Sequence, residues 1–281
     1  MLSDEQLTQY ERDGYIHLRG VVPQDALELA HTILKRWEEQ TVQRWVDDGV
    51  LTDPMSDLDF EHRLVQTWDK AGRPEYIRSP RRDLVGRETF DFLCHRAFVD
   101  IAEALLGTPE ISVHGLFNAR PKLPDQSWTN TPWHQDAQYY KDAADLHVVS
   151  MWMPLQQVTE ENSCLQVAPG AHKGTLHEAW DDTESGFIGL APEIQDTLTA
   201  VSIEMETGDL LCFSQRTPHR ALPNQSDAVR WSMDIRFEAT EQATESGRDR
   251  GFIARSPADP NRVGTYDQWL ALWKDQPKGT H

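Results

Sequence analysis

The sequence contains little cysteine, few basic residues and no long hydrophobic run. Only 3 of its 281 residues are cysteine, and Cys94, Cys164 and Cys212 are widely scattered, with no CxxC pair. This excludes a disulfide framework and a cysteine-rich zinc site. No stretch of about 18 apolar residues occurs, and the first residues lack the basic and apolar segments of a signal peptide. We therefore expect a soluble protein with reduced thiols, located in the cytoplasm.

Positive charge is the second deficit. The 27 Lys and Arg residues are outnumbered by 46 Asp and Glu residues, which gives a net charge of −19 at pH 7. Such a field repels the phosphates of nucleic acids and of anionic lipid headgroups. We therefore expect a small-molecule substrate, and neither nucleic acid nor a membrane as a partner. The sequence does not indicate an oligomeric state.

The first 107 residues carry mainly helical patterns. Ser3 and Gln6 fit a capping box at the start of the first helix. Gly14 and Gly107 are placed to end helices. The predicted elements are a helix over residues 3–13, a strand over 15–22, a helix from Pro23, a short helix over 64–68 within a loop region (52–87) and a helix over 90–106.

After Gly107 short β-rich segments replace the helical pattern, with Pro, Gly and Asn between them. Such spacing favours a β-sandwich or barrel over parallel βαβ units. Without repeats or an obvious linker, we expect one domain, residues 1–281: a helical region (1–107), a β core (108–240) and a C-terminal loop and helix (241–281). The predicted strands are 111–119, 148–154, 164–168, 198–203, 209–213 and 230–237, and the last helix is 265–273.

The segment Thr131–Asp136, TPWHQD, carries the first chemical signal. In an extended strand residues i and i+2 share a face, so His134 and Asp136 could hold one metal ion. His219, in another β-rich segment, completes two histidines and one carboxylate, a ligand set that leaves open positions on Fe(II). By itself His-x-Asp is weak evidence, since a surface histidine paired with its neighbour gives the same pattern.

A second signal lies in residues 230–237. Strand alternation places Arg230, Ser232, Asp234 and Arg236 on one face. A guanidinium that faces a barrel interior needs an anion, and a cosubstrate carboxylate that extends from the metal would satisfy Arg230. The alternative is that Arg230 pairs with Asp234 or with a surface acid. For Arg236 we expect a structural salt bridge.

These motifs, with others along the chain, resemble the phytanoyl-CoA dioxygenase family of Fe(II)- and 2-oxoglutarate-dependent oxygenases. The resemblance implies a double-stranded β-helix (jelly-roll, cupin-like) core with flanking helices. It implies Fe(II) on His134, Asp136 and His219, and 2-oxoglutarate on Arg230. Trp152 and Leu116 correspond to family positions beside the cosubstrate. The segments that carry it are Gly14–Ile16, Trp133–Asp136, Trp152–Leu155, Glu161–Leu165, Pro169–Lys173, Gly208–Asp209 and His219–Arg230.

The reaction implied by the resemblance consumes O2 and converts 2-oxoglutarate into succinate and CO2 while a C–H bond of the substrate is oxidised. We expect hydroxylation, although desaturation, epoxidation and cyclisation share this chemistry. Because Asp136 is present, whereas related halogenases have a small residue there, oxygenation is favoured over halogenation. The sequence departs from the family at Ala221, where a serine often helps to hold the 2-oxoglutarate carboxylate, and at Ser163 and Ala171 in turns.

Several further residues have two possible roles. The residues around the metal motif could line the substrate pocket or form a solvated rim, and four other histidines could be ligands or structural. An Arg-rich island near the C-terminus could clamp an anion, but a solvated loop is favoured. The pocket residues are Asn118, Arg120, Gln126, Trp128, Gln135, Gln138 and Tyr139, the histidines are His114, His147, His172 and His177, and the island is Arg248, Arg250 and Arg255.

Two other functions fit parts of the pattern. One is a cupin-like metalloenzyme that does not use 2-oxoglutarate, and the other is a non-catalytic jelly-roll binding protein that keeps the metal residues as a relic. An acyl-CoA substrate is disfavoured, because a chain of net charge −19 has no obvious Lys/Arg cluster for the phosphates of CoA.

Overall fold

The computed structural model describes residues 2–74, 81–126, 130–140, 147–182 and 187–274. Its helices are α1 (Asp4–Asp13), α2 (Gln24–Asp47), α3 (Arg63–Lys70), α4 (Arg81–Leu84), α5 (Arg87–Leu93), α6 (Arg96–Leu106), α7 (Pro192–Gln195), α8 (Glu245–Arg250) and α9 (Tyr266–Ala271). Its strands are β1 (Tyr15–Leu18), β2 (Ile111–Val113), β3 (Asn118–Lys122), β4 (Val148–Pro154), β5 (Leu165–Val167), β6 (Trp180–Asp181), β7 (Ile188–Gly189), β8 (Val201–Ile203), β9 (Leu210–Ser214), β10 (His219–Ala221), β11 (Arg230–Ala239) and β12 (Phe252–Arg255).

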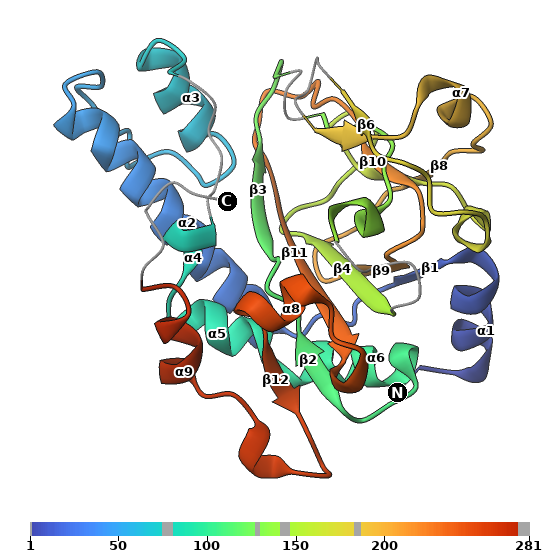
Figure 1. Cartoon of the computed structure of the whole chain (residues 1–281). Helices are drawn as coiled ribbons and strands as arrows, with labels where there is room; N and C mark the ends of the chain where they lie inside the picture. The colour runs from blue at the N-terminus through green and yellow to red at the C-terminus, as the bar shows by residue number, and fades with distance from the viewer. Residues whose placement is uncertain (1, 75–80, 127–129, 141–146, 183–186, 275–281) are drawn as a thin grey trace.

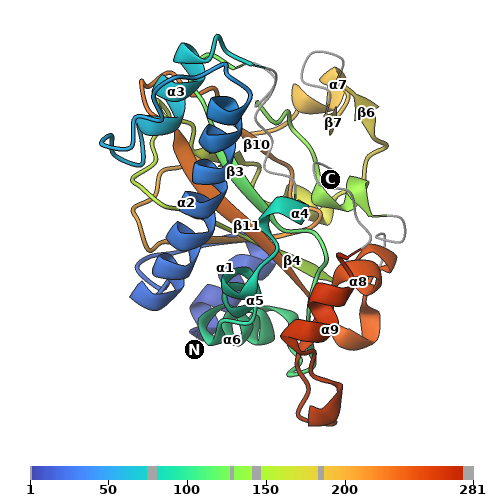
Figure 2. The ribbon, with the colours of Figure 1, turned by 90° about the vertical axis from the view of Figure 1, so that its left-hand side faces the viewer.

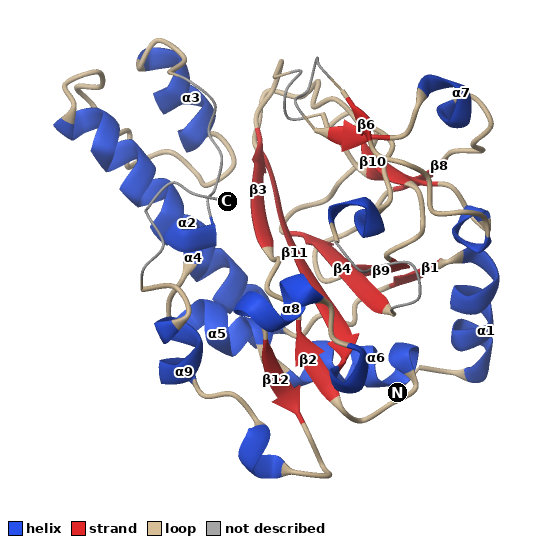
Figure 3. Cartoon of the chain, in the orientation of Figure 1, coloured by secondary structure: helices blue, strands red, loops and turns tan. Residues whose placement is uncertain are grey.

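The strands form a seven-stranded antiparallel sheet, a three-stranded sheet and a small two-stranded one (Figure 1). The large sheet has the order β1-β9-β4-β11-β2-β12, and β3 also pairs with β11. The three-stranded sheet has the order β10-β5-β8, and β6 pairs with β7. Together the sheets form the expected double-stranded β-helix with flanking helices (Figure 3).

Helices cover one face of the large sheet. Figure 2 shows α2 lying across β11 and β3, with α4 beside it and α5 and α6 below it. The apolar side chains of β11 point towards these helices, and Trp231 packs edge-on against Trp37 of α2 with 6.1 Å between ring centroids. Within the described ranges, no helix is both long and apolar enough to cross a membrane.

The predicted elements are largely present. The structure also contains short elements that were not predicted (α7, α8, β6 and β7), and it differs in three further ways. The helix predicted over residues 90–106 is two helices, because His95 adopts an extended backbone and caps α6 by accepting a hydrogen bond from the Ala97 amide. The segment 111–119 is split between β2 and β3. The polar C-terminal loop contains β12, which pairs with β2 and stacks Phe252 on Phe90 at 4.9 Å. The break at His95 is a local cap that the apolar periodicity does not show, whereas the pairing of β12 with β2 depends on contacts between distant segments.

Candidate metal centre

The structure brings His134, Asp136 and His219 together from two chain segments. The backbones of His134 and His219 exchange two hydrogen bonds of 3.0 Å each, as an isolated antiparallel bridge. The spacing predicted that Asp136 lies in a strand. In the structure Asp136 instead begins a 3-10 helix (Asp136–Tyr139). The Gln138 side chain accepts a hydrogen bond from the Gln135 amide at 2.9 Å, and the Gln138 backbone amide donates to the Gln135 carbonyl, so the chain turns immediately after His134.

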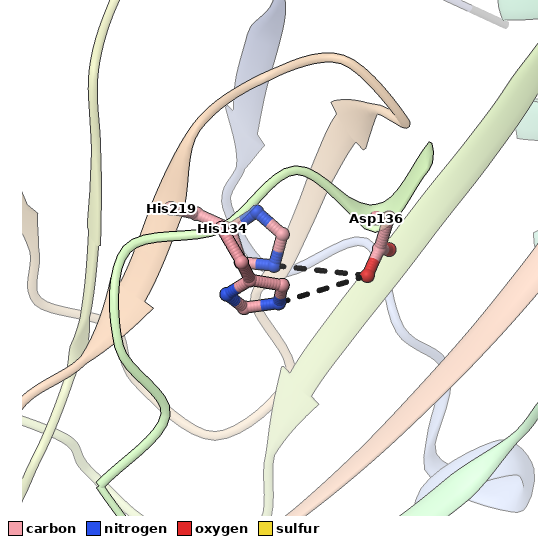
Figure 4. Close-up of side chains that lie close together, drawn as sticks. All are labelled: His134, Asp136 and His219. Carbon is pink, nitrogen blue, oxygen red and sulfur yellow. Dashed lines mark ion pairs between the residues drawn. The ribbon is translucent and has the colours of Figure 1, made fainter. Parts of the chain in front are cut away.

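The three side chains point at one another (Figure 4). Oδ1 of Asp136 lies 3.8 Å from Nε2 of His134 and 4.0 Å from Nε2 of His219. One potential ligand atom from each residue lies within 4.8 Å of the others. Each Nδ1 contacts a backbone carbonyl oxygen, that of Pro132 at 2.8 Å or of Thr217 at 3.0 Å. Since a carbonyl only accepts, each Nδ1 carries the proton and each Nε2 presents a lone pair, the tautomer that a metal ligand requires.

The electrostatics keep these residues in the protonation states that bind a cation. Burial, together with the neighbouring His219, lowers the pKa of His134 to about 3. Burial also lowers the pKa of His219. Although burial alone would raise the pKa of Asp136, the positive charge of Arg236 and its hydrogen bonds hold it far below its ordinary value. Two neutral imidazoles and one carboxylate form a donor set that fits Fe(II) and leaves coordination positions open.

The guanidinium of Arg236 holds the carboxylate of Asp136 through two hydrogen bonds. Its Nε and Nη2 donate to Oδ2 and Oδ1 of Asp136, each at 3.0 Å, and Ser150 Oγ also donates to Oδ2. Nη1 of Arg236 donates to Asp234 at 2.7 Å. The expected structural salt bridge of Arg236 is present, and one of its partners is Asp136 itself. Sequence reasoning missed that partner, although the alternation along β11 had placed Arg236 on the correct face.

Arg230 lies towards the other end of the same face. It is 2% exposed, and its guanidinium lies over the Trp152 ring, 5.4 Å from the ring centroid. Nη1 donates to Ser232, while the buried Nε has no partner among the described residues. Burial lowers the pKa of Arg230 to about 9. Asp234, the alternative partner, instead accepts hydrogen bonds from Arg120, Arg236 and Asn118.

The remaining predicted site residues are spread around this face. Leu116 packs beside Ala137 and Tyr140, and its carbonyl lies 3.4 Å from Nη1 of Arg236. The Asn118 amide donates to Asp234 at 2.6 Å. Tyr139 is 40% exposed, and its ring meets that of His134 edge-on at 5.9 Å. Tyr139 is therefore accessible to a substrate beside the metal ligands.

The two glutamines of the pocket prediction hold loops in place. Gln135 is fully buried, donates to the Arg216 carbonyl at 2.8 Å and accepts from the His177 amide at 3.0 Å. The Gln138 amide donates to carbonyls of the facing segment, including Gly189 at 3.2 Å. These bonds use the polar atoms that a substrate would need.

The other predicted residues lie outside the triad. His172 contacts the Glu11 carbonyl at 3.2 Å, His114 accepts from the Leu116 amide at 3.0 Å, and His147 is exposed. Gln126 is buried, and Trp128 lies outside the described residues.

The three arginines of the C-terminal island do not converge on one point. Arg255 pairs with Asp100 and Glu103 of α6, Arg250 lies over the Trp273 ring at 5.2 Å, and Arg248 donates to the Ala243 carbonyl. The island therefore serves the packing of the C-terminal region.

A double-stranded β-helix that gathers two histidines and a carboxylate over its polar face defines a cupin-like metalloprotein of the oxygenase type. The sequence profile of the family described as phytanoyl-CoA dioxygenase (PhyH) matches residues 10–232. The chain belongs to this family, and the protein is an oxygenase.

Individual proteins agree with the family assignment. The probable phytanoyl-CoA dioxygenase of Caenorhabditis elegans is 26% identical over 307 residues, which cover 98% of this chain and 91% of the relative. The methylphosphonate hydroxylase of Gimesia maris is 27% identical over 241 residues and covers 85% and 81%. Among solved structures, Micromonospora carbonacea EvdO2 complexed with 2-oxoglutarate superposes with a TM-score of 0.57 at 21% identity, covering 95% and 97%. This likeness supports the fold.

Proposed function

We propose that the protein is an Fe(II)- and 2-oxoglutarate-dependent dioxygenase that hydroxylates an unactivated C–H bond of a small molecule. The observation that carries the proposal is the polar face of the large sheet. At one end of this face Arg236 holds Asp136, which belongs to the triad with His134 and His219, and at the other end Arg230 has no acidic partner in the described chain. A metal chelated by a dicarboxylic 2-oxoacid would satisfy both ends at once.

When bound, iron would supply the oxidative chemistry that couples decarboxylation of 2-oxoglutarate to attack on the substrate. His134, Asp136 and His219 would hold it. Arg236 and Ser150 orient the Asp136 carboxylate and thereby fix the angle at which it meets a metal. Trp152 covers the Arg230 guanidinium and excludes water from the cosubstrate end of the site.

The substrate class is proposed only as a small molecule. The names of relatives refer to a CoA ester, to methylphosphonate and, for one from Streptomyces arenae, to 1-deoxypentalenic acid, so relatives act on chemically different compounds. We propose Tyr139 for substrate contact, because its side chain is exposed beside His134, whereas the side-chain amide of Asn118 is held by Asp234 and Arg81. Oxygenation is favoured over halogenation because the carboxylate of Asp136 reaches the metal centre.

We further propose that residues 1–281 act as one oxygenase domain in the cytoplasm. Strand β1 from the N-terminal region and β12 from the C-terminal region both belong to the large sheet, which supports a single cooperative unit. The three cysteines are free thiols, as a reducing compartment would keep them.

The experiment is an anaerobic titration of purified protein with Fe(II) and then 2-oxoglutarate. We expect the weak visible metal-to-ligand charge-transfer band of a chelated 2-oxoacid. Arg230→Ala should raise the 2-oxoglutarate concentration needed for the band roughly 10-fold or more, because a charge-assisted, bidentate contact is lost. His134→Ala should lose the band altogether.

Arg220→Ala is the matched control. Arg220 is adjacent to His219, but its side chain contacts residues outside the triad. It donates to Gln166 at 2.7 Å and lies over the Trp133 ring. Its substitution should leave the band unchanged. Iron binding without the band would favour the cupin-like enzyme that does not use 2-oxoglutarate, and no iron binding would favour the non-catalytic binding protein.

A further inference from the structure

Lys122 is the neighbour of Arg230 across the β3–β11 strand pair. It is the last residue of β3, and the register of β3 and β11 places it directly opposite Arg230. Both residues are only 2% exposed. Like charges directly opposite on neighbouring strands destabilise a sheet, and buried cations are costly unless they are paired. The structure therefore places two buried cationic side chains side by side, and neither has an acidic partner among the described residues.

The contacts of Lys122 do not neutralise it. Its Nζ donates to the carbonyl oxygen of Leu222, a neutral acceptor. Burial, with the charges of Arg230 and Arg120, lowers the pKa of Lys122 well below its ordinary value. An ammonium group has three N–H donors, so two remain for another acceptor.

The position of Nζ is informative because Leu222 directly follows Ala221. Ala221 stands where the family often has a serine that helps to hold the 2-oxoglutarate carboxylate. It is 8% exposed on β10, where it pairs with Leu165. The methyl group of Ala221 offers no hydrogen bond, whereas Lys122 delivers a donor to the carbonyl of the next residue from the opposite sheet.

We propose that Lys122 and Arg230 together bind the distal carboxylate of 2-oxoglutarate, and that Lys122 supplies the donor that Ala221 lacks. This inference rests on the proposed function, because it requires 2-oxoglutarate as cosubstrate. The carboxylate accepts from the free N–H groups of Lys122 and from the guanidinium of Arg230. Its negative charge then compensates the two buried cations, so the cosubstrate completes this end of the fold.

Lys122→Met separates this role from a structural one, because the two roles predict opposite changes in stability. Methionine keeps most of the side-chain volume and removes the charge. If Lys122 serves the cosubstrate, the ligand-free protein should unfold at a higher temperature, while 2-oxoglutarate should bind roughly 10- to 100-fold more weakly. If Lys122 only supports Leu222, the ligand-free protein should become less stable.

The measurements are thermal unfolding of the ligand-free protein and anaerobic titration of the Fe(II) protein with 2-oxoglutarate, followed by the charge-transfer band. Ala221→Ser added to Lys122→Met should recover part of the lost affinity. Lys173→Met, at an exposed lysine, is the control and should change neither readout.

Unchanged 2-oxoglutarate affinity in Lys122→Met would overturn the inference, and so would a loss of stability without a loss of affinity. Arg230→Ala keeps this failure distinct from failure of the proposed function. If Arg230→Ala weakens binding and Lys122→Met does not, the function stands and the role of Lys122 is wrong. If neither variant weakens binding, 2-oxoglutarate does not bind at this end of the site and both proposals fall.

Discussion

The two faces of strand β11 are equally buried and chemically opposite. On the outer face, Trp231, Met233, Ile235 and Phe237 are at most 2% exposed and pack towards the helices. On the inner face, which looks into the β-helix, Arg230, Ser232, Asp234, Arg236 and Glu238 are at most 7% exposed. Burial alone therefore does not say what a position does.

The energetic logic of the two faces differs. The outer face removes apolar area from water, which stabilises the fold in proportion to the area buried. The inner face pays a desolvation penalty for each ionised group, and ion pairs such as Arg236 with Asp136 offset part of it. A polar face of this kind is retained for chemistry, since well-packed apolar residues would stabilise the sheet at least as well.

The largest expected effect comes from truncating the outer face. Trp231 is fully buried, stacks on Phe60 with 4.6 Å between ring centroids and donates its indole N–H to the Phe60 carbonyl. Trp231→Ala should lower the free energy of unfolding by about 3–5 kcal/mol, because it removes a large side chain and leaves a cavity. Urea denaturation measures this change.

The separation of the two faces of β11 also predicts the 2-oxoglutarate affinity of Trp231→Ala. At a temperature where Trp231→Ala is still folded, its 2-oxoglutarate affinity should match that of the unsubstituted protein, although Trp231 is the chain neighbour of Arg230. A weakened affinity in the folded variant would show that the two faces are coupled through the strand and do not act separately.

An intermediate effect is expected at Ser150 on the inner face of β4. Ser150 is fully buried and donates its hydroxyl to Oδ2 of Asp136. Ser150→Ala should weaken Fe(II) binding roughly 10- to 100-fold, because groups that orient a metal ligand are worth about that much. The fold should lose only about 1 kcal/mol, the typical contribution of one hydrogen bond. Competition with a chelator of known affinity measures the first change, and urea denaturation the second.

Met151, the next residue along β4, is the matched comparison. It is 1% exposed and belongs to the apolar core on the outer face. Met151→Ala should reverse the pattern and lose stability while keeping its iron affinity. If both variants lost iron affinity equally, the hydrogen bond of Ser150 would not be what positions Asp136.

The same comparison explains how much could be predicted from sequence. Alternation along residues 230–237 correctly separated the two faces, because a strand has a side-chain period of two. The family motifs singled out His134, Asp136 and His219, which the structure gathers. The contact of Arg236 with Asp136 could not be predicted, because it requires β11 to run beside the turn that begins at Asp136. No local pattern encodes that tertiary neighbour.

Register limits prediction in the same way. Lys122 lies opposite Arg230 only because β3 pairs with β11 in one particular register, and the sequence merged β2 and β3 into one predicted strand. Gln135 and Gln138 lie beside the metal motif in sequence, yet their side chains hold the 3-10 turn and the facing loop. Sequence proximity to a ligand therefore does not separate residues that hold the backbone, such as Gln135, from an exposed residue such as Tyr139.

The smallest expected effect concerns Glu238, which lies near the end of β11 opposite Arg230. It tests whether this buried carboxyl group is ionised in the folded protein. Glu238 is fully buried, its Oε2 accepts from the Thr244 amide at 2.9 Å, and Oε1 has no partner in the described chain. Burial raises the pKa of Glu238 to about 7 from 4.5. Between these values the folded protein binds more protons than the unfolded chain, so the contribution of Glu238 to stability falls as pH rises.

Glu238→Gln should remove that contribution while keeping an acceptor for the Thr244 amide. The difference in unfolding free energy between the variant and the unsubstituted protein should therefore grow in favour of the variant from pH 5 to pH 7, by at most about 1.4 kcal/mol per pH unit. Urea denaturation across this range measures it, with the exposed Glu241→Gln as control. Parallel stability curves for Glu238→Gln and the unsubstituted protein would mean that Glu238 is ionised in the fold, and that buried charge on the inner face extends beyond the catalytic end.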